Sequence, residues 1–447
     1  MTVDGDKLGL LGGLLEKAKA AGADSCDAMF IEGVSLSHAQ RLGKPENIQR
    51  SEGSDLGLRV FVGKCQAIVS SSDSSPEALD EMTARAVAMA QKAPEDPYCG
   101  LADPSQLATE FPDLDTRDAA EPTQAALRDL AKRAEDAARA VPGVTNSDGA
   151  EAGWSSHVVT FAASNGFAQT YANSRHSLGV SVLAGEGAKM ETDYDYDTAI
   201  YGEDLRQPED IGRTAGERAV KRLNPRKAAT AQVPVVYDPR VSGGVVSHLS
   251  MAINGSAITR GASFLKDKLG ERIFPEAVTI IDDPRRIRGL RSKPFDGEGV
   301  ATKRRNIVEN GVLRTWILDL GSARQLAMET TGHASRGVSS PPSPAATNLH
   351  LEPGALSPKK LMADIESGLY VTELIGFGIS AVTGDYSRGA GGFWIENGEL
   401  AYPVSELTVA GNLNQMFANL SAADDLEFRY GVNAPTLRID GLMVAGS

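Results

Sequence analysis

The sequence predicts an α+β fold, in which an N-terminal α/β region with helices packed on a sheet precedes a strand-rich, barrel-like or sandwich-like C-terminal domain. Two observations predict it. Up to about residue 225, segments with helical spacing of apolar residues alternate with short strand patterns, whereas beyond it short strands and glycine-rich turns dominate. We therefore expect domains at 1–226 and 227–447, with a candidate subdivision of the first near 95–120, after a linker that begins at Pro94.

Helices and strands alternate in the N-terminal region. The spacing of apolar residues places helices at about 6–20, 76–93, 123–140 and 209–223. Strand patterns lie at about 56–69, with a turn at Gly63 and Lys64, and at 157–163, 167–171 and 177–184. Helix, hairpin and helix therefore occur twice in the same order, as an internal duplication would produce, although the residues of the two copies do not match.

In the C-terminal region, two hairpins are nearly explicit. Strand patterns there run into Asn310-Gly311 and Asn397-Gly398, and Asn-Gly favours the positive φ angles of a tight type I′ turn. Helices are expected near 242–253, 322–328 and 357–366. The segment 331–347 is built mainly from Gly, Ser, Pro and Ala and has almost nothing to bury, so we expect it to be disordered or a functional loop.

Composition argues against two classes of partner. With 45 basic and 59 acidic residues, the chain carries a formal charge of −14, and a surface this acidic repels a nucleic-acid backbone. No apolar run approaches the roughly 18 residues that a membrane span requires. The three cysteines are widely spaced, and the acidic, glycine-interrupted N-terminus is unlike a signal peptide. We expect a cytoplasmic protein with no nucleic-acid or membrane partner.

Few residues in the sequence point to chemistry by themselves. Asp193, Asp195 and Asp197 alternate with Tyr194 and Tyr196, so on a strand their carboxylates would share one face, either solvated or able to hold a hard cation. The Gly and Glu that a calcium loop requires are replaced by Thr198 and Asp204, which favours the solvated face. None of the six histidines lies three or four residues from another, so a helical zinc motif is not formed.

A long motif supplies the resemblance that composition does not. Residues 384–399 read GDYSRGAGGFWIENGE, and shorter matches are Gly57-Leu58-Arg59-Val60, Ser263-Phe264-Leu265, Thr347-Asn348-Leu349 and Pro294-Phe295-Asp296-Gly297-Glu298-Gly299. In these segments the chain resembles the PmbA (TldE) branch of the TldD/PmbA family, from about residue 30 to the end.

This resemblance implies a function. TldD and TldE proteins form the two subunits of a cytoplasmic zinc metallopeptidase that trims small or unfolded peptides, and the family carries an older label as modulator of DNA gyrase. In TldD the metal is held by two histidines of an HExxxH helix and by a cysteine near the C-terminus. The resemblance also implies an α/β N-terminal region followed by a strand-rich C-terminal domain.

Compared position by position, the metal motif is degenerate in this chain. His248 matches the first histidine, but Leu249 stands at the glutamate and Ile253 at the second histidine, and residues 426–437 contain no cysteine. A catalytic zinc needs about three protein ligands and a nearby proton acceptor, which Leu and Ile cannot provide. The resemblance therefore implies no catalytic residue, metal ligand or cofactor in this chain, with zinc held by a TldD-type partner.

The glycine-rich segments are the candidates for contact with a peptide. Small residues let a peptide main chain approach closely and pair as an added strand. The substrate-channel candidates are Gly332, Thr347, Asn348, Asp385, Tyr386, Gly389 and Gly391. Two alternatives stay open: a self-sufficient hydrolase with a mechanism that does not use HExxxH, and a homodimeric peptide-binding or regulatory protein. Homodimers could also form when the partner is missing.

Overall fold

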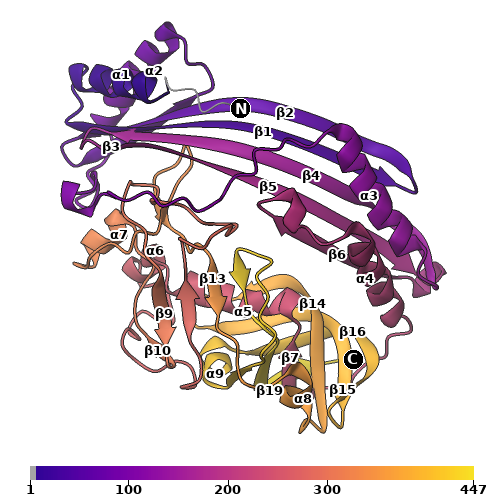
Figure 1. The fold of residues 1–447 in the computed structure, drawn as a ribbon. Helices are drawn as coiled ribbons and strands as arrows, with labels where there is room; N and C mark the ends of the chain where they lie inside the picture. The colour runs from indigo at the N-terminus through magenta and orange to yellow at the C-terminus, as the bar shows by residue number, and fades with distance from the viewer. Residues whose placement is uncertain (1–6, 447) are drawn as a thin grey trace.

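A long, curved antiparallel sheet arches over a smaller barrel-containing half in the computed structural model, which describes residues 7–446 (Figure 1). The sheet has the strand order β3-β2-β1-β4-β5-β6. Its strands are β1 (Ser25–Arg41), β2 (Lys44–Val62), β3 (Cys65–Ser71), β4 (Val144–Ala163), β5 (Ala168–Ala184) and β6 (Glu191–Ala199). We call it the first sheet, and residues 231–446 the C-terminal half.

Four helices cover one face of the first sheet. Helices α1 (Lys7–Ala20) and α2 (Pro76–Ala90) bury apolar side chains against one end of it, and α3 (Gln124–Arg139) and α4 (Pro208–Lys221) do so at the other end. Ser75 caps α2, because its side chain accepts a hydrogen bond from the N–H of Ala78. All four predicted helices are confirmed; residue 6, the predicted start of the first, lies outside the described residues.

Each half of the first sheet is a helix, a three-stranded meander and a helix, and the two halves meet where β1 pairs with β4. The repeated order expected from the sequence is therefore present, with a third strand in each copy. The sequence prediction missed all of β1 and the first parts of β2 and β4. In β1, the face that the helices do not cover carries small polar residues such as Ser35 and Ser37, so this strand lacks the continuous apolar run of a strand buried on both faces.

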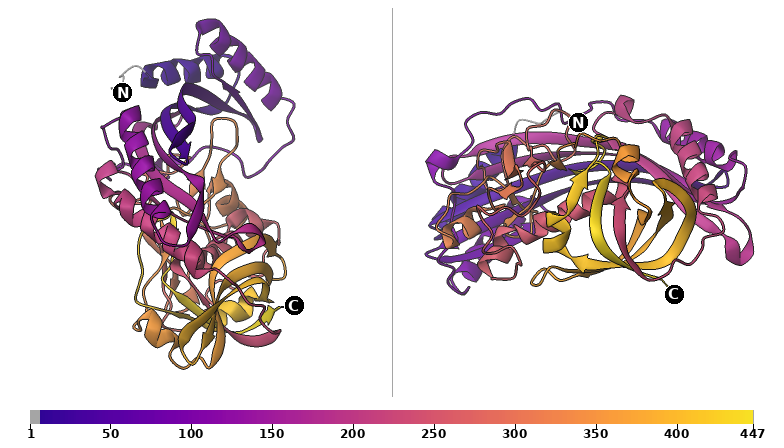
Figure 2. Two further views of the ribbon diagram at one scale, coloured as in Figure 1. Left: turned by 90° about the vertical axis from the view of Figure 1, so that its right-hand side faces the viewer. Right: turned by 90° about the horizontal axis from the view of Figure 1, so that it is seen from below.

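The C-terminal half contains a closed barrel, which confirms the strand-rich, barrel-like prediction (Figure 2). Its sheet runs in the order β16-β15-β14-β7-β19, and pairing of β16 with β19 closes it. The barrel strands are β7 (Ala231–Tyr237), β14 (Ser367–Ile379), β15 (Asp385–Glu396), β16 (Glu399–Asn412) and β19 (Leu437–Ala445). The short β17 (Leu420–Ala422) extends it beside β19.

A second, smaller sheet packs beside the barrel in the order β10-β9-β8-β13-β18. Its strands are β8 (Ile280–Asp282), β9 (Arg305–Glu309), β10 (Val312–Leu313), β13 (Leu349–Leu351) and β18 (Val432–Asn433). The helices here are α5 (Pro239–Ala252), α6 (Gly255–Thr259), α7 (Leu320–Gln325), α8 (Pro358–Met362) and α9 (Leu413–Ala418). Both predicted Asn-Gly hairpins are confirmed, with φ of 50° at Asn310 and Asn397. No helix within residues 7–446 combines the length and apolarity needed to cross a membrane.

The segment 331–347 is an ordered hairpin that reaches the first sheet, so the expectation that it has almost nothing to bury is wrong. Thr331, His333 and Ala334 are buried, and β11 (Ala334–Ser335) pairs with β12 (Ser343–Pro344). The segment buries polar groups as well as Ala334 and Pro344. The carbonyl of Ala334 accepts a hydrogen bond from Lys293 Nζ at 2.9 Å, and its N–H donates to Asp296 at 3.0 Å.

The tip of this hairpin is ionically bonded to the first sheet. Asp27 on β1 accepts hydrogen bonds from Arg59 Nε on β2 at 2.9 Å and from Arg336 Nη1 in the hairpin at 2.5 Å. The three side chains are at most 4% exposed. Phe295 adds an apolar contact, since its ring lies 4.9 Å from Phe167 and 5.2 Å from Tyr171 of the first sheet. The first sheet with its helices and the C-terminal half form two layers. A buried ion cluster beside an aromatic cluster therefore joins these two layers.

The contact between this hairpin and β2 can be tested at one glycine. A Cβ added to Gly57 would lie 2.1 Å from the carbonyl oxygen of Val338, whereas one added to Gly53 on the same strand meets nothing within 4 Å. We expect Gly57→Ala to lower the free energy of unfolding in urea by about 1–3 kcal/mol, the usual cost of overpacking. Gly53→Ala is the control and should change it far less; equal effects would contradict the contact.

Candidate functional site

The helix that matches the family's metal helix is α5. Asp238 caps its N-terminus by accepting the N–H of Arg240 at 3.0 Å, and Pro239 occupies the first turn. His248 is 9% exposed, and Leu249 and Ile253 are completely buried in the core of the C-terminal half. Of the three positions that correspond to the HExxxH motif, those of Leu249 and Ile253 are thus ordinary core residues.

His248 lies among groups that do not bind metal. Its ring contacts Tyr386 edge-on, with 5.9 Å between the ring centroids, and no described residue is hydrogen-bonded to Nδ1. Burial lowers the pKa of His248 to about 4, with a further contribution from the positive charge of Arg388 on β15. The imidazole is therefore neutral near pH 7 and stands close to a permanent cation.

Zinc does not fit this position. Residues 7–446 contain no group of three or more His, Cys, Asp or Glu side chains placed to hold a metal ion. All three cysteines lie in the N-terminal region, where Cys26 is buried and Cys65 and Cys99 are half-buried. A guanidinium beside the one remaining histidine repels a divalent cation, so no step of a reaction can be assigned to metal bound here.

The carboxylates of β6 are not available for a cation. Asp193, Asp195 and Asp197 are only 2–7% exposed, whereas Tyr194 and Tyr196 are 48% and 38% exposed. The prediction of a solvated acidic face is therefore wrong, because the alternation of β6 turns the carboxylates inward against arginines.

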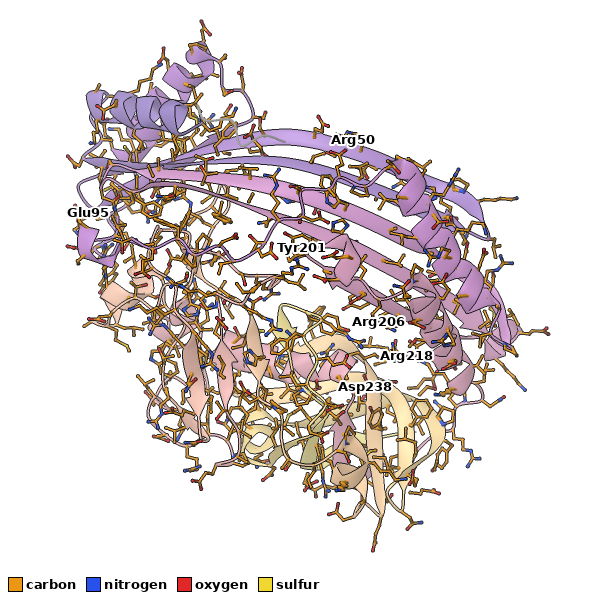
Figure 3. The ribbon with its side chains drawn as sticks, viewed as in Figure 1. Arg50, Glu95, Tyr201, Arg206, Arg218 and Asp238 are labelled. Carbon is orange, nitrogen blue, oxygen red and sulfur yellow. The ribbon has the colours of Figure 1, made fainter. Side chains whose placement is uncertain are left out.

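Each of these carboxylates is engaged by arginine. Asp193 accepts from Arg240 of α5 at 2.7 Å, and Asp195 accepts from Arg206 and Arg218 at 2.7 and 2.9 Å. Asp197 accepts the backbone N–H of Arg206 at 2.8 Å. Arg218 lies on α4 and Arg206 in the loop before it, and Figure 3 shows both labels between the first sheet and the C-terminal half. Of these contacts, the bond from Arg240 of α5 to Asp193 joins the first sheet to the C-terminal half, and the others hold β6 to α4 and the loop before it.

Two adjoining cavities lie between the layers. One of about 350 Å³, the Lys293 cavity, is bounded by the aromatic cluster, Lys293 and Arg336. The other, of about 360 Å³, is the Arg286 cleft, bounded by the end of β6, residues 286–290 and residues 427–430. They share Ile200, Gly289 and Leu290 as walls. Both volumes fall within the range of small-ligand sites.

The predicted channel candidates divide between these cavities and the barrel. Thr347 lines the Lys293 cavity, but its hydroxyl donates a hydrogen bond to Asp282. Asn348 lines the Arg286 cleft, but its side chain donates a hydrogen bond to Ser292 and accepts the N–H of Arg291. Gly332, with φ of +71°, makes a tight turn against the carbonyl of Ala301 and lines neither cavity. Thr347 and Asn348 are thus close to the space between the layers, and act as its scaffold.

The four candidates from β15 lie in the barrel wall. Asp385 is exposed and bonded to Thr383 and Asn412, Tyr386 packs on His248, and Gly391 lies near the Arg222–Glu373 ion pair. Gly389 is paired with Ile375 on β14 and with Thr408 on β16. The main chain of β15 is hydrogen-bonded on both sides, so it cannot accept a peptide as an added strand.

A buried carboxylate in the motif at 294–299 was missed as a site residue. Glu298 accepts the N–H of Leu320 at 2.9 Å and lies 3.8 Å from Arg59, at the wall of a further cavity of about 340 Å³. Burial raises its pKa to about 8, although Arg59 acts in the opposite direction. Only the run Asp296-Gly297-Glu298, two acids beside a turn, hinted at it in the sequence.

Comparison with known proteins shows the family of this chain. Models of the PmbA/TldA metallopeptidase match domain 1 at residues 26–90, the central domain at 117–223 and the C-terminal domain at 230–446. Metalloprotease PmbA of Escherichia coli O157:H7 is 38% identical over 428 residues, which cover 95% of this chain and 93% of that protein. The chain belongs to the PmbA/TldD family. A PmbA homologue from Haemophilus influenzae is 37% identical, covering 97% of this chain and 94% of that protein.

Solved structures of other proteins share the whole fold. A protein of Bacteroides thetaiotaomicron that carries the gyrase-modulator label is 28% identical, with a TM-score of 0.92 and complete coverage of both chains. TldE from Thermococcus kodakarensis has a TM-score of 0.85 over 98% of this chain and 100% of that one. At 20% identity, the latter likeness concerns the fold alone.

The raised pKa of Glu298 predicts a pH dependence of stability. The folded state keeps its proton up to about pH 8, whereas the unfolded chain releases it near the ordinary value of 4.5. Its contribution is therefore complete below about pH 4.5 and is lost as the pH rises through about 8. Glu298→Gln mimics the protonated form. As the pH rises from about 5 to 8, we expect its free energy of unfolding in urea to increase relative to that of the wild type by up to a few kcal/mol. Parallel pH curves would contradict the shift.

Proposed function

We propose that this chain is the non-catalytic, TldE-type subunit of a cytoplasmic zinc metallopeptidase that degrades or processes small unfolded peptides. A TldD-type partner supplies the zinc, the nucleophilic water and the general base, and this chain shapes the channel that holds the peptide. The observation that carries the proposal is the state of α5, where Leu249 and Ile253 are buried in the core and His248 stands beside Arg388.

The chemistry of hydrolysis explains why a partner is needed. A peptidase zinc requires three ligands and an open position for water, together with a group that takes the proton of that water. His248 is one neutral ring without a second ligand on α5, and Leu249 has no proton to exchange. This chain therefore has no cofactor of its own in the proposal.

The channel role is supported by the two cavities between the layers. An extended peptide needs a continuous space with polar groups, and the Lys293 cavity and the Arg286 cleft share three wall residues. Their polar walls come from both layers, so the space depends on how the first sheet is joined to the C-terminal half. In this proposal a self-sufficient hydrolase built on β6 is not favoured, because arginines occupy its carboxylates.

The proposal predicts how activity is divided between the two subunits. The purified chain should carry no stoichiometric zinc in elemental analysis and should cleave no unstructured peptide. An equimolar mixture with a TldD-type chain that has an intact HExxxH motif should copurify as a complex, contain zinc in that partner only, and cleave such peptides. Tight zinc or peptidase activity in the lone chain would overturn the proposal, as would failure of the two chains to associate.

A second prediction concerns the residual histidine. In the complex, His248→Ala should leave kcat/KM for peptide cleavage largely unchanged, because a buried ring with a pKa of about 4 neither holds the metal nor acts as an efficient base near pH 7. The same substitution at the first histidine of the partner's HExxxH helix is the positive control and should abolish activity. A loss of several orders of magnitude in the folded His248→Ala complex would assign a direct role to His248.

A further inference from the structure

Four arginines line the Arg286 cleft, namely Arg206, Arg286, Arg288 and Arg429. Three of them are neutralised by carboxylates. Arg206 is bonded to Asp195 at 2.7 Å, Arg288 to Asp115 at 2.6 Å, and Arg429 forms an ion pair with Glu427. Arg286 has no carboxylate within ion-pair distance among the described residues. Arg286 is therefore the one arginine of this wall without an ion pair among the described residues, in a wall that also includes the carboxylates of Asp197, Asp204 and Glu427.

The guanidinium of Arg286 is held flat on an aromatic ring. Its Cζ lies 3.4 Å from the ring centroid of Phe428, and the ring of His350 contacts the same phenylalanine at 4.9 Å. Stacking uses the face of a guanidinium and leaves the N–H groups on its edge free. Phe428 is 40% exposed, so this platform borders the open cleft.

Both sides of the stack are fixed by the backbone. The carbonyl of Arg286 accepts hydrogen bonds from Ser292 Oγ at 2.6 Å and from the N–H of Gly289 at 3.1 Å. On the other side, Asn433 Oδ1 accepts the N–H groups of Arg429 and Tyr430 at 3.0 and 2.8 Å. Partial burial also lowers the pKa of Arg286 from its ordinary value, although the charge of Asp283 acts in the opposite direction. A pre-positioned, poorly hydrated guanidinium gains most from an anionic partner.

We propose that Arg286, supported by Phe428, binds a carboxylate of the peptide in the Arg286 cleft. A planar guanidinium presents two parallel donors that match the two oxygens of a carboxylate. The carboxylate can be the C-terminus of the peptide or an Asp or Glu side chain, and both have the same recognition chemistry. This inference takes from the proposed function only the statement that the ligand is a peptide, and it makes this chain a determinant of substrate preference.

The test measures direct binding to the full-length chain, with fluorescently labelled, unstructured peptides. Three peptides share one uncharged sequence: the first has a free C-terminal carboxylate, the second an amidated C-terminus, and the third an amidated C-terminus with one internal Glu. The proteins are the wild type, Arg286→Gln and, as the control with the same change of charge, Arg304→Gln. Arg304 is 55% exposed and is not among the residues that line the cleft.

We expect at least one carboxylate-bearing peptide to bind the wild type about tenfold more tightly than the uncharged peptide, as one charge-assisted contact allows. Arg286→Gln should abolish that advantage and leave the uncharged peptide unaffected, and Arg304→Gln should retain it. Comparison of the first and third peptides identifies the source of the carboxylate. Phe428→Leu, which keeps the charge and removes the platform, should weaken the advantage only in part.

Two results would overturn the inference: equal binding of all three peptides by the wild type, or an advantage that persists in folded Arg286→Gln. Urea unfolding verifies that each variant is folded. The assay needs neither zinc nor the partner subunit. Its failure therefore leaves the test of subunit activity unaffected, and failure of that test leaves this binding measurement valid.

Discussion

The arrangement of the two layers depends on one buried carboxylate. Burial alone would raise the pKa of Asp27, but Arg336 and Arg59 hold it below its ordinary value, so the group is ionised inside the protein. A buried charge is tolerated only when it is paired, and here one partner comes from the first sheet and the other from the hairpin at 331–347. This pairing fixes the hairpin on the first sheet beside the Lys293 cavity, whose wall includes Arg336.

Beside the aromatic cluster around Phe295, further contacts between the layers are ionic. Asp193 of β6 is bonded to Arg240 at the start of α5, and Arg222 after α4 is bonded to Glu373 of the barrel. Charged side chains of this length fill space less completely than interlocking aliphatic ones, and they need polar neighbours. Ionic contacts of this kind accommodate polar cavities, which a packed apolar interface would close.

The sequence was sufficient for the local elements and insufficient for the parts that depend on contacts distant along the chain. Helical spacing and the Asn-Gly turns located the N-terminal helices and two hairpins, because those signals are local. Strand β1 is not predicted from the sequence, because one of its faces includes polar residues such as Ser35 and Ser37. The aspartates of β6 were placed on the wrong side because their arginine partners lie on α4, on α5 and in a loop.

The same reason explains what was found and missed at the site. The degenerate positions Leu249 and Ile253 could be identified from the motif, whereas the stack of Arg286 on Phe428 joins two segments that only the fold brings together. Arg286 belongs to a run of basic residues at 285–291, which by itself is typical of a solvated surface. Its lack of a carboxylate partner becomes visible only when the neighbouring arginines are seen to be paired.

The junction of β1 with β4 has a consequence for how the first sheet can be assembled. Fourteen residue pairs, from Asp27 with Ala163 to Gln40 with Ala150, connect two units of the same helix and strand order. Either unit alone would expose this long row of unpaired backbone groups at a sheet edge, where a strand of another copy could pair with them. Covalent linkage of the two units within one chain makes that pairing intramolecular, so it no longer depends on protein concentration and cannot propagate into larger aggregates.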